Sequence, residues 1–191
     1  MIKRGSSAPV TLIIIPTREL AEQIYVQARK LLHDTGINVV KVYGGVPHEG
    51  QIKDFKWGCD ILVATPGRLL DYLKSGLVTL SQVKYFIIDE ADRILDMGFE
   101  PQLNSITFEN DLREKRKRLN LFFSATFTPE VRNIARKFMN DYYFITKNKD
   151  EENQVNENIK QVVVQAEENE KLFKLHGILQ QIQGSVISKL I

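Results

Sequence analysis

Short apolar runs alternate with longer amphipathic segments, and this alternation constrains the fold more than any other feature of the chain. Six apolar runs predict β-strands: TLIII (11–15), NVVKVY (38–43), DILVA (60–64), YFIID (85–89), NLFFS (120–124) and YYFI (142–145). The segments between them predict helices near 18–33, 47–56, 67–75, 91–97, 100–107 and 130–139. Strands that alternate with helices form βαβ units with right-handed crossovers. The sequence therefore predicts an α/β fold with a parallel sheet that helices cover on both faces.

The first predicted helix shows the periodicity of an amphipathic surface helix. Leu20, Ile24, Ala28 and Leu31 recur at intervals of four, four and three residues, which places them on one helical face. We expect this face to pack against the sheet.

The composition changes after the sixth apolar run. KNKDEENQVNEN (147–158) is almost wholly polar and predicts a linker. One strand, IKQVVVQA (159–166), and one helix (169–182) follow it. Because one strand and one helix cannot close a hydrophobic core, we expect 1–146 to form one domain and 159–191 to begin a second.

The overall composition excludes several classes of protein. With 43% hydrophobic and 26% charged residues, the chain is typical of a soluble globular protein, and its formal charge of +2 does not by itself indicate nucleic-acid binding. No apolar run approaches the ~18 residues of a membrane span. Cys59 is the only cysteine, which favours an intracellular protein, cytoplasmic or nuclear and not secreted. The histidines, His33, His48 and His176, are too scattered to indicate a zinc site.

Two predicted helices begin with a threonine and carry an arginine in their first turn. They are IIIPTREL, with Thr17 and Arg18, and LVATPGRLL, with Thr65, Gly67 and Arg68. Threonine is a good N-cap, but the positive end of a helix normally favours Asp or Glu. Arginine beside free backbone N–H groups suits a bound phosphate. The alternative is that both arginines extend into solvent; two such sites together favour phosphate binding.

Two further strand ends carry candidate functional residues. YGG (43–45) predicts a turn at which the backbone can approach a ligand closely, although most Gly-Gly pairs are only turns. IIDEAD ends a buried strand with Asp89, Glu90 and Asp92, a pattern that suits Mg²⁺ held through water together with a base for an attacking water. In the alternative interpretation, Asp89 caps the next helix and Glu90 lies in its first turn. Judged alone, the two interpretations are equally supported.

The basic run REKRKR (113–118) has two interpretations as well. It could be a nucleic-acid or localisation patch, but a solvated loop between a helix and a strand is favoured.

The motifs PTREL, GG, TPGR, DEAD and SAT occur in this order at predicted strand ends, and with them the chain resembles the DEAD-box ATP-dependent RNA helicases. GCDILVATPGRLLDYL and IIDEADRILDMGFEPQL are most similar to the Vasa-like branch, and the resemblance runs from Val10 to Leu179. It implies a RecA-like (P-loop NTPase) domain, truncated at its N-terminus, followed by the first strand and helix of a second RecA-like domain.

The resemblance also implies roles for individual residues. Asp89 would hold Mg²⁺ through water, Glu90 would act on the hydrolytic water, and Asp92 would help to link the ATP state to the other domain. The SAT residues would contact the DEAD residues and couple hydrolysis to strand separation; they are Ser124, Ala125 and Thr126. Six residues would bind the RNA sugar-phosphate backbone without reading base sequence: Thr17, Arg18, Gly45, Thr65, Gly67 and Arg68. The implied cofactors are ATP and Mg²⁺, and the implied macromolecular partner is RNA.

The sequence departs from the family pattern in one respect that bears on catalysis. The family's phosphate loop, G-x-x-x-x-G-K-[ST], should precede PTREL, yet the 191 residues contain no Gly-Lys dipeptide. The adenine-recognising segment and the second domain's arginine finger are also missing. We therefore expect an inactive fragment of a helicase, with part of the sheet uncovered and hydrophobic. The alternatives are a short RNA-binding protein without catalysis and, third, an unrelated doubly wound domain.

Overall fold

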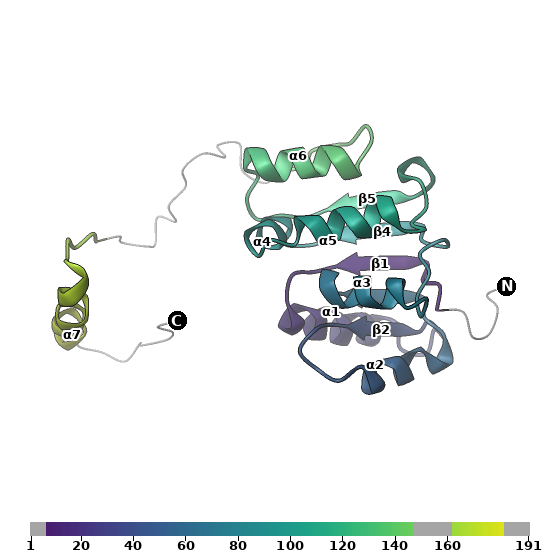
Figure 1. Ribbon diagram of the computed structural model, residues 1–191, viewed down its shortest axis with the longest axis horizontal. Helices are drawn as coiled ribbons and strands as arrows, with labels where there is room; N and C mark the ends of the chain where they lie inside the picture. The colour runs from purple at the N-terminus through teal and green to yellow at the C-terminus, as the bar shows by residue number, and fades with distance from the viewer. Residues whose placement is uncertain (1–6, 147–161, 182–191) are drawn as a thin grey trace. The chain divides into compact units, whose positions relative to one another are not determined.

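Five parallel strands form one sheet in the order β2-β3-β1-β4-β5 in the computed structural model, which describes residues 7–146 and 162–181 (Figure 1). The strands are β1 (Thr11–Ile14), β2 (Val39–Val42), β3 (Ile61–Ala64), β4 (Tyr85–Ile88) and β5 (Leu119–Phe122). Five of the six strands predicted for this region are thereby confirmed, and the parallel α/β fold with them. The chain divides into two compact units, Met1–Glu151 and Glu152–Ile191, and each is described by itself.

The register of the strands brings all five carboxyl ends to the same edge of the sheet. Ile14 at the end of β1 is paired with Ala64 and Ile88, Ala64 with Val42, and Ile88 with Phe122. Every one of these residues is the last of its strand. We call this side the carboxyl edge; its segments are 15–18, 43–46, 65–68, 89–92 and 123–126.

The six helices predicted between the strands are present. They are α1 (Arg18–Leu31), α2 (His48–Asp54), α3 (Pro66–Lys74), α4 (Ala91–Asp96), α5 (Glu100–Asn104) and α6 (Pro129–Phe138). The helix expected over 100–107 changes after Asn104 into a π-helical turn, η2 (Ser105–Glu109). Two 3₁₀ turns complete this unit, η1 (Phe55–Trp57) and η3 (Lys115–Lys117).

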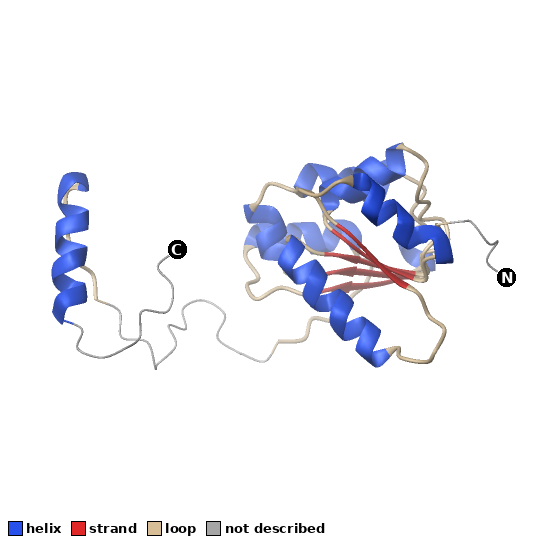
Figure 2. Cartoon of the chain, turned by 90° about the horizontal axis from the view of Figure 1, so that it is seen from below, coloured by secondary structure: helices blue, strands red, loops and turns tan. Residues whose placement is uncertain are grey.

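Helices cover both faces of the sheet (Figure 2). On one face, Ala21 of α1 packs with Val63 and its neighbours in a small apolar cluster. The larger cluster on the other face joins alternate strand residues, such as Leu12 and Phe86, to side chains from α3, α4, α5 and α6. Because successive residues of a strand point to opposite faces, the nearly continuous apolar runs of the sequence fill both clusters.

The predicted apolar face of α1 is only partly buried. Leu20, Ile24 and Ala28 are half-buried as expected, but Leu31 is 83% exposed, so its assignment to the packed face is wrong. The reason is length: a helix of 14 residues extends about 21 Å, whereas a strand of four residues extends about 13 Å. The last turn of α1 therefore projects beyond the strands it covers.

The run YYFI (142–145) was predicted to be a strand, and this prediction is wrong. The segment has no regular secondary structure, and Tyr143 is 96% exposed. A strand requires a hydrogen-bonded neighbour, and within the described residues β5 pairs only with β4. A groove of about 690 Å³ lies between β5 and residues 139–145.

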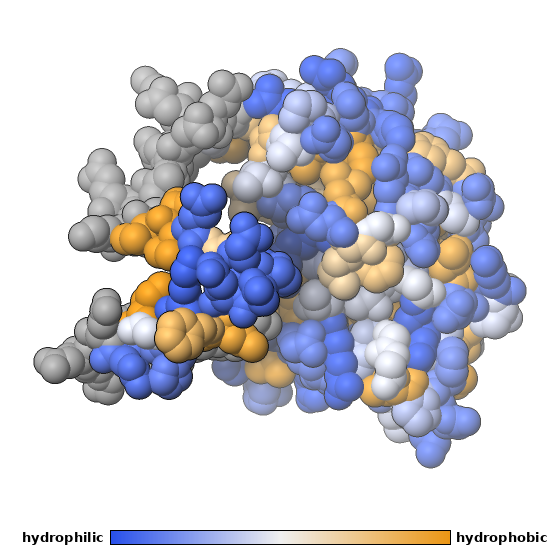
Figure 3. All heavy atoms as spheres, turned by 60° about the vertical axis from the view of Figure 1, so that its left-hand side comes forward, coloured by the Kyte–Doolittle hydropathy of each residue, from blue (hydrophilic) through white to orange (hydrophobic). Residues whose placement is uncertain are grey.

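The sheet carries exposed hydrophobic side chains at its β4–β5 end, as expected. Leu119 and Phe123 are 54% and 53% exposed, and Tyr85 is exposed as well. Figure 3 shows hydrophobic side chains at the surface among the hydrophilic ones. This end of the sheet is therefore partly uncovered and apolar.

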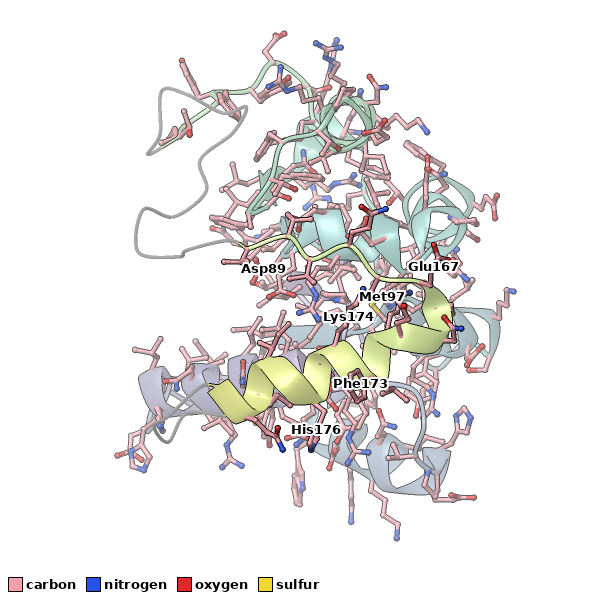
Figure 4. The ribbon with its side chains drawn as sticks, turned by 90° about the vertical axis from the view of Figure 1, so that its left-hand side faces the viewer. Asp89, Met97, Glu167, Phe173, Lys174 and His176 are labelled. Atoms are coloured by element: carbon pink, nitrogen blue, oxygen red, sulfur yellow. The ribbon has the colours of Figure 1, made fainter. Side chains whose placement is uncertain are left out.

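The described part of the second unit, residues 162–181, contains the helix α7 (Lys171–Gln181), preceded by the 3₁₀ turn η4 (Glu168–Glu170). The helix expected over 169–182 is therefore confirmed, and Glu167 with Glu170 forms a capping box at its start. Figure 4 labels Phe173, an exposed apolar side chain of α7. The strand predicted over 159–166 is not formed in its described part, 162–166, which has no neighbouring strand to pair with. The predicted linker, 147–158, lies outside the described residues.

Candidate functional site

The N-terminus of α1 has the cap that the sequence predicts. Thr17 is extended, and its Oγ1 accepts a hydrogen bond of 3.3 Å from the N–H of Leu20. Arg18 follows and is exposed, with its guanidinium carbon 5.2 Å from the centre of the Tyr43 ring. Among the described residues no carboxylate pairs with Arg18. Among the described residues a cation without a direct ion pair therefore lies beside a helix N-terminus, with Glu22 acting on it only through a longer-range charge interaction, and this arrangement suits an anion.

The N-terminus of α3 is built differently. Thr65 is the N-cap residue, but its side chain makes no capping hydrogen bond. Apart from its chain neighbours and the backbone of its own helix, no described atom lies within 4 Å of the position that a Cβ on Gly67 would take, so the backbone is open to a ligand there. Both helices thus present their first turns at the carboxyl edge.

Arg68 does not extend into solvent, contrary to one of the two interpretations of the sequence. Its side chain is 7% exposed, and Nη2 donates a hydrogen bond of 2.8 Å to the carbonyl oxygen of Val46. The buried Nη1 has no hydrogen-bond acceptor among the described residues. A buried donor without an acceptor is costly, so a ligand oxygen that reached Nη1 would be favourably bound.

The Gly-Gly turn after β2 is held by a residue that the sequence did not single out. Gln51 of α2 is buried, its Oε1 accepts a hydrogen bond of 2.8 Å from the N–H of Tyr43, and its Nε2 donates one of 3.0 Å to the carbonyl oxygen of Tyr43. Gly45 has a φ of +78° and is exposed. The turn is therefore fixed from one side by Gln51 and from the other by Arg68. A glutamine within an amphipathic helix gives no sequence signal for this role.

Asp89 and Glu90 are not arranged as an ordinary helix cap. The N–H of Asp89 donates to the carbonyl oxygen of Ile14 at 3.0 Å, and Asp89 Oδ1 accepts from the N–H of Glu90 at 2.9 Å. Glu90, not Asp89, is the N-cap residue of α4, and it makes no capping hydrogen bond. The interpretation in which Asp89 caps this helix is therefore wrong.

Glu90 adopts a left-handed backbone conformation, with φ 49° and ψ 51°. This conformation costs a non-glycine residue roughly 1–2 kcal/mol. Its Oε2 accepts a hydrogen bond of 2.9 Å from Arg93 Nη1. Backbone strain of this kind is concentrated at functional sites, where the surrounding structure maintains it.

Asp89 could serve as a partial ligand of a hard cation. Its Oδ2 makes no hydrogen bond with the described residues, and the side chain is half-buried at the end of β4. No group of three or more His, Cys, Asp or Glu side chains that could hold a metal ion occurs in the described ranges. One carboxylate of this kind fits Mg²⁺, which retains several waters and takes few protein ligands. The remaining ligands would have to come from a bound phosphate and from water.

Asp92 joins the segment after β4 to the segment after β5. Its Oδ2 accepts hydrogen bonds from the N–H of Thr126 at 3.0 Å and from the Thr126 hydroxyl at 2.9 Å. The N–H of Asp92 donates to Ser124 Oγ at 3.2 Å, and Ala125 lies between these two contacts. Burial by itself raises the pKa of Asp92, but hydrogen bonds, led by those from Thr126, hold the pKa below its ordinary value. The Asp92 carboxylate is thus a charged bridge between the two strand ends.

The order of the strands divides the candidate residues into two groups along the carboxyl edge. The segments with Arg18, Gly45 and Arg68 follow the neighbouring strands β1, β2 and β3, whereas the acidic segment and the SAT segment follow β4 and β5. Because β1 and β4 are neighbours, Asp89 lies directly beside the segment that carries Arg18.

The basic run 113–118 lies at the opposite edge, before β5. Lys115 and Arg116 are exposed, as a solvated loop requires. Arg118 is not solvated: it is 8% exposed, its Nε donates to Asn120 Oδ1 at 2.7 Å, and its guanidinium lies 4.9 Å from the centre of the Phe86 ring. Burial lowers the pKa of Arg118 to about 10. The last residue of the run is therefore part of the packed structure.

No helix in the described ranges combines the length and hydrophobicity that a membrane span requires.

Comparisons with known proteins agree with this geometry. The family model described as "DEAD/DEAH box helicase" matches residues 1–134. The chain is 48% identical over 143 residues to DEAD-box ATP-dependent RNA helicase 52A of Oryza sativa subsp. japonica; the match covers 75% of this chain and 24% of that protein. It thus spans about a quarter of this curated relative.

Two solved structures resemble the chain at levels of identity that support more than a shared fold. The yeast DEAD-box splicing factor Prp28 has a TM-score of 0.64 and 37% identity, over 69% of this chain and 31% of that one. A DEAD box protein from Methanococcus jannaschii has a TM-score of 0.65 and 39% identity, over 92% of this chain and 46% of that one.

Proposed function

Because the chain belongs to the DEAD/DEAH box helicase family, we propose that it is part of an ATP-dependent RNA helicase that couples ATP hydrolysis to local unwinding or remodelling of RNA. The five-stranded RecA-like sheet forms most of the first helicase domain, residues 1–146. In this proposal 147–158 link it to the beginning of a second domain, 159–191. Membership of the Vasa-like branch stays a prediction.

RNA binds at the part of the carboxyl edge that follows β1, β2 and β3. The proposed contacts are Thr17, Arg18, Gly45, Thr65, Gly67 and Arg68. Two helix N-termini and the exposed Arg18 offer donors to phosphate oxygens. Arg68 contributes mainly by holding the turn that contains Gly45, through its hydrogen bond to Val46. Contacts of this kind recognise the RNA backbone and not its base sequence.

ATP and Mg²⁺ bind at the part of the edge that follows β4 and β5. Asp89 holds Mg²⁺ through water, and the carboxylate of Glu90 orients the attacking water and accepts its proton. Bound Mg²⁺ supplies neutralisation of the charge on the phosphates. Asp92, with Ser124, Ala125 and Thr126, links the two strand ends, so a change at Asp89 or Glu90 is passed to the SAT segment.

One observation carries the proposal: the Arg18 segment and the Asp89 segment follow adjacent strands of one sheet. The N–H of Asp89 donates to the carbonyl oxygen of Ile14, four residues before Arg18. A backbone hydrogen bond thus joins the segment with the proposed phosphate contact to the segment with the carboxylate pair suited to water activation. Hydrolysis on one side can therefore alter RNA binding on the other.

RNA binding is tested by fluorescence anisotropy with unrelated single-stranded RNAs over a range of salt concentrations. Arg18→Glu is expected to weaken binding similarly for every sequence and to reduce the slope of log K against log salt by about 1. Lys115→Glu, with the same charge change at the opposite edge, is the matched control. Equal losses for the two variants would show that general charge, and not this edge, binds RNA.

Catalysis is tested separately by phosphate release. Residues 1–191 contain no G-x-x-x-x-G-K-[ST] sequence, so on their own they are expected to show no RNA-stimulated hydrolysis, and Glu90→Gln is expected to change nothing. In a chimera completed with the flanking segments of the Methanococcus jannaschii relative, Glu90→Gln is expected to abolish turnover and to leave ATP binding largely intact. Turnover by residues 1–191 alone would contradict this part of the proposal. RNA binding without turnover in the chimera would favour the non-catalytic alternative.

A further inference from the structure

Three side chains beside the candidate RNA site form a compact charged cluster. Glu22 of α1 accepts a hydrogen bond from the Tyr43 hydroxyl on Oε1 and pairs with Lys41 Nζ through Oε2. Tyr43 is buried, and Lys41 and Glu22 are half-buried. Both carboxylate oxygens of Glu22 are therefore engaged by groups on or next to β2.

Arg18 is in a position to compete for the same carboxylate. It lies four residues before Glu22 on α1, a spacing at which oppositely charged side chains pair on a helix. The structure nevertheless shows no ion pair between them among the described residues, and the guanidinium lies against the Tyr43 ring instead. A guanidinium on an aromatic face is held in place while its N–H groups remain available to an acceptor.

The protonation states support this arrangement. Hydrogen bonding by Lys41, followed by that of Tyr43, lowers the pKa of Glu22 below its ordinary value, so Glu22 is ionised at neutral pH. The hydrogen bond to Glu22 raises the pKa of Tyr43, so Tyr43 remains a neutral donor. At neutral pH, Glu22 therefore carries the negative charge, and Tyr43 the proton, that their hydrogen bond and the pairing with Lys41 require.

We propose that Glu22, Lys41 and Tyr43 are positioning residues for RNA binding. Lys41 and Tyr43 each bind one carboxylate oxygen of Glu22, which keeps Glu22 from pairing with Arg18. The Tyr43 ring holds the Arg18 guanidinium toward an RNA phosphate. Without Lys41, Glu22 pairs with Arg18 and withdraws it from the phosphate. This inference rests on the proposed RNA-binding function of the carboxyl edge.

The main test is Lys41→Met, measured by anisotropy on residues 1–191 with a single-stranded RNA. RNA affinity is expected to fall roughly two- to threefold, which corresponds to the free energy of an exposed ion pair that now competes for Arg18. Adding Glu22→Gln to this variant removes the competitor and is expected to restore affinity.

A matched control separates this effect from net charge. Glu19 lies on the exposed first turn of α1, next to Arg18, and Lys41→Met/Glu19→Gln has the same net charge as Lys41→Met/Glu22→Gln. The inference requires that Glu22→Gln restores affinity and that Glu19→Gln restores clearly less. Equal restoration would overturn it, because charge alone would then explain both.

A double-mutant cycle tests the role of the Tyr43 ring. Arg18→Ala and Tyr43→Leu are each expected to weaken RNA binding, by roughly two- to fivefold for the ring, and their combination is expected to cost no more than Arg18→Ala alone. Additive losses would show that Tyr43 acts independently of Arg18. Circular dichroism verifies that Tyr43→Leu is folded, and the Lys41 variants decide the question if it is not.

The outcomes also distinguish this inference from the function on which it rests. If Arg18→Ala binds RNA with wild-type affinity, Arg18 does not contact RNA, and both its proposed role and this inference are wrong. Weakened binding in Arg18→Ala together with unchanged binding in Lys41→Met overturns the positioning cluster and leaves the proposed function standing.

Discussion

The bridge between Asp92 and Thr126 should contribute to stability in a manner that depends on pH. Thr126→Val keeps the shape of the side chain and the backbone N–H, but removes the hydroxyl that donates to Asp92 Oδ2 at 2.9 Å. A hydrogen bond to a charged group contributes roughly 1.5–3 kcal/mol when buried. Because Thr126 is exposed, we expect a loss of about 1 kcal/mol at pH 7, or roughly 2–4 °C in Tm for a unit of this size.

The sign of the pH dependence follows from the direction of the pKa shift. Burial raises the pKa of Asp92, but the hydrogen bonds, led by those from Thr126, lower it below its ordinary value of 3.8. A carboxylate whose pKa is lowered by folding stabilises the protein above its unfolded pKa, and this stabilisation is lost as the pH falls through the folded pKa. The difference in unfolding free energy between wild type and Thr126→Val should therefore shrink below about pH 4.

The assay is urea denaturation followed by circular dichroism at pH 7 and at several values down to about pH 3. Thr107→Val is the matched control, because the Thr107 hydroxyl donates to the uncharged carbonyl oxygen of Leu103 at 2.8 Å. Its cost should not depend on the ionisation of any carboxylate. A cost of Thr126→Val that is as independent of pH as that of Thr107→Val would refute the reasoning.

Three further predictions concern surface, packing and strain. The apolar surface beside β5 should bind an environment-sensitive dye, and Leu119→Lys with Phe123→Lys should reduce its fluorescence; an unchanged signal would place the dye elsewhere. Arg118→Leu should lower the unfolding free energy by about 1–2 kcal/mol in urea titrations, because it removes the contacts with Phe86 and Asn120. The control Arg116→Leu, at an exposed position, should change the unfolding free energy by less than about 0.5 kcal/mol. Glu90→Gly should raise the unfolding free energy by roughly 0.5 kcal/mol, and with it the melting temperature, because glycine adopts the left-handed conformation without strain. A lower melting temperature would mean that the ion pair of Glu90 with Arg93 stabilises the protein by more than the strain destabilises it.

The sequence by itself determined the elements and the face of the molecule on which function is expected. The runs TLIII and YFIID form β1 and β4, and Thr17 caps α1, because burial periodicity and capping depend on residues a few positions apart. In a parallel sheet all carboxyl ends share one edge, so the position of the motifs after strands was enough to place them together.

Only the tertiary structure decided how these pieces act on one another. The order β2-β3-β1-β4-β5 places the segment that carries Arg18 next to the segment that carries Asp89, and no local pattern encodes which strands become neighbours. The same holds for the burial of Arg68 and the packing of Arg118 on Phe86, since these contacts join segments 22 and 32 residues apart. YYFI has the composition of a strand, but it lacks a neighbour with which to pair. Helix caps and apolar periodicity are local and can be read from sequence, whereas strand pairing and side-chain burial depend on residues that only the folded chain brings together.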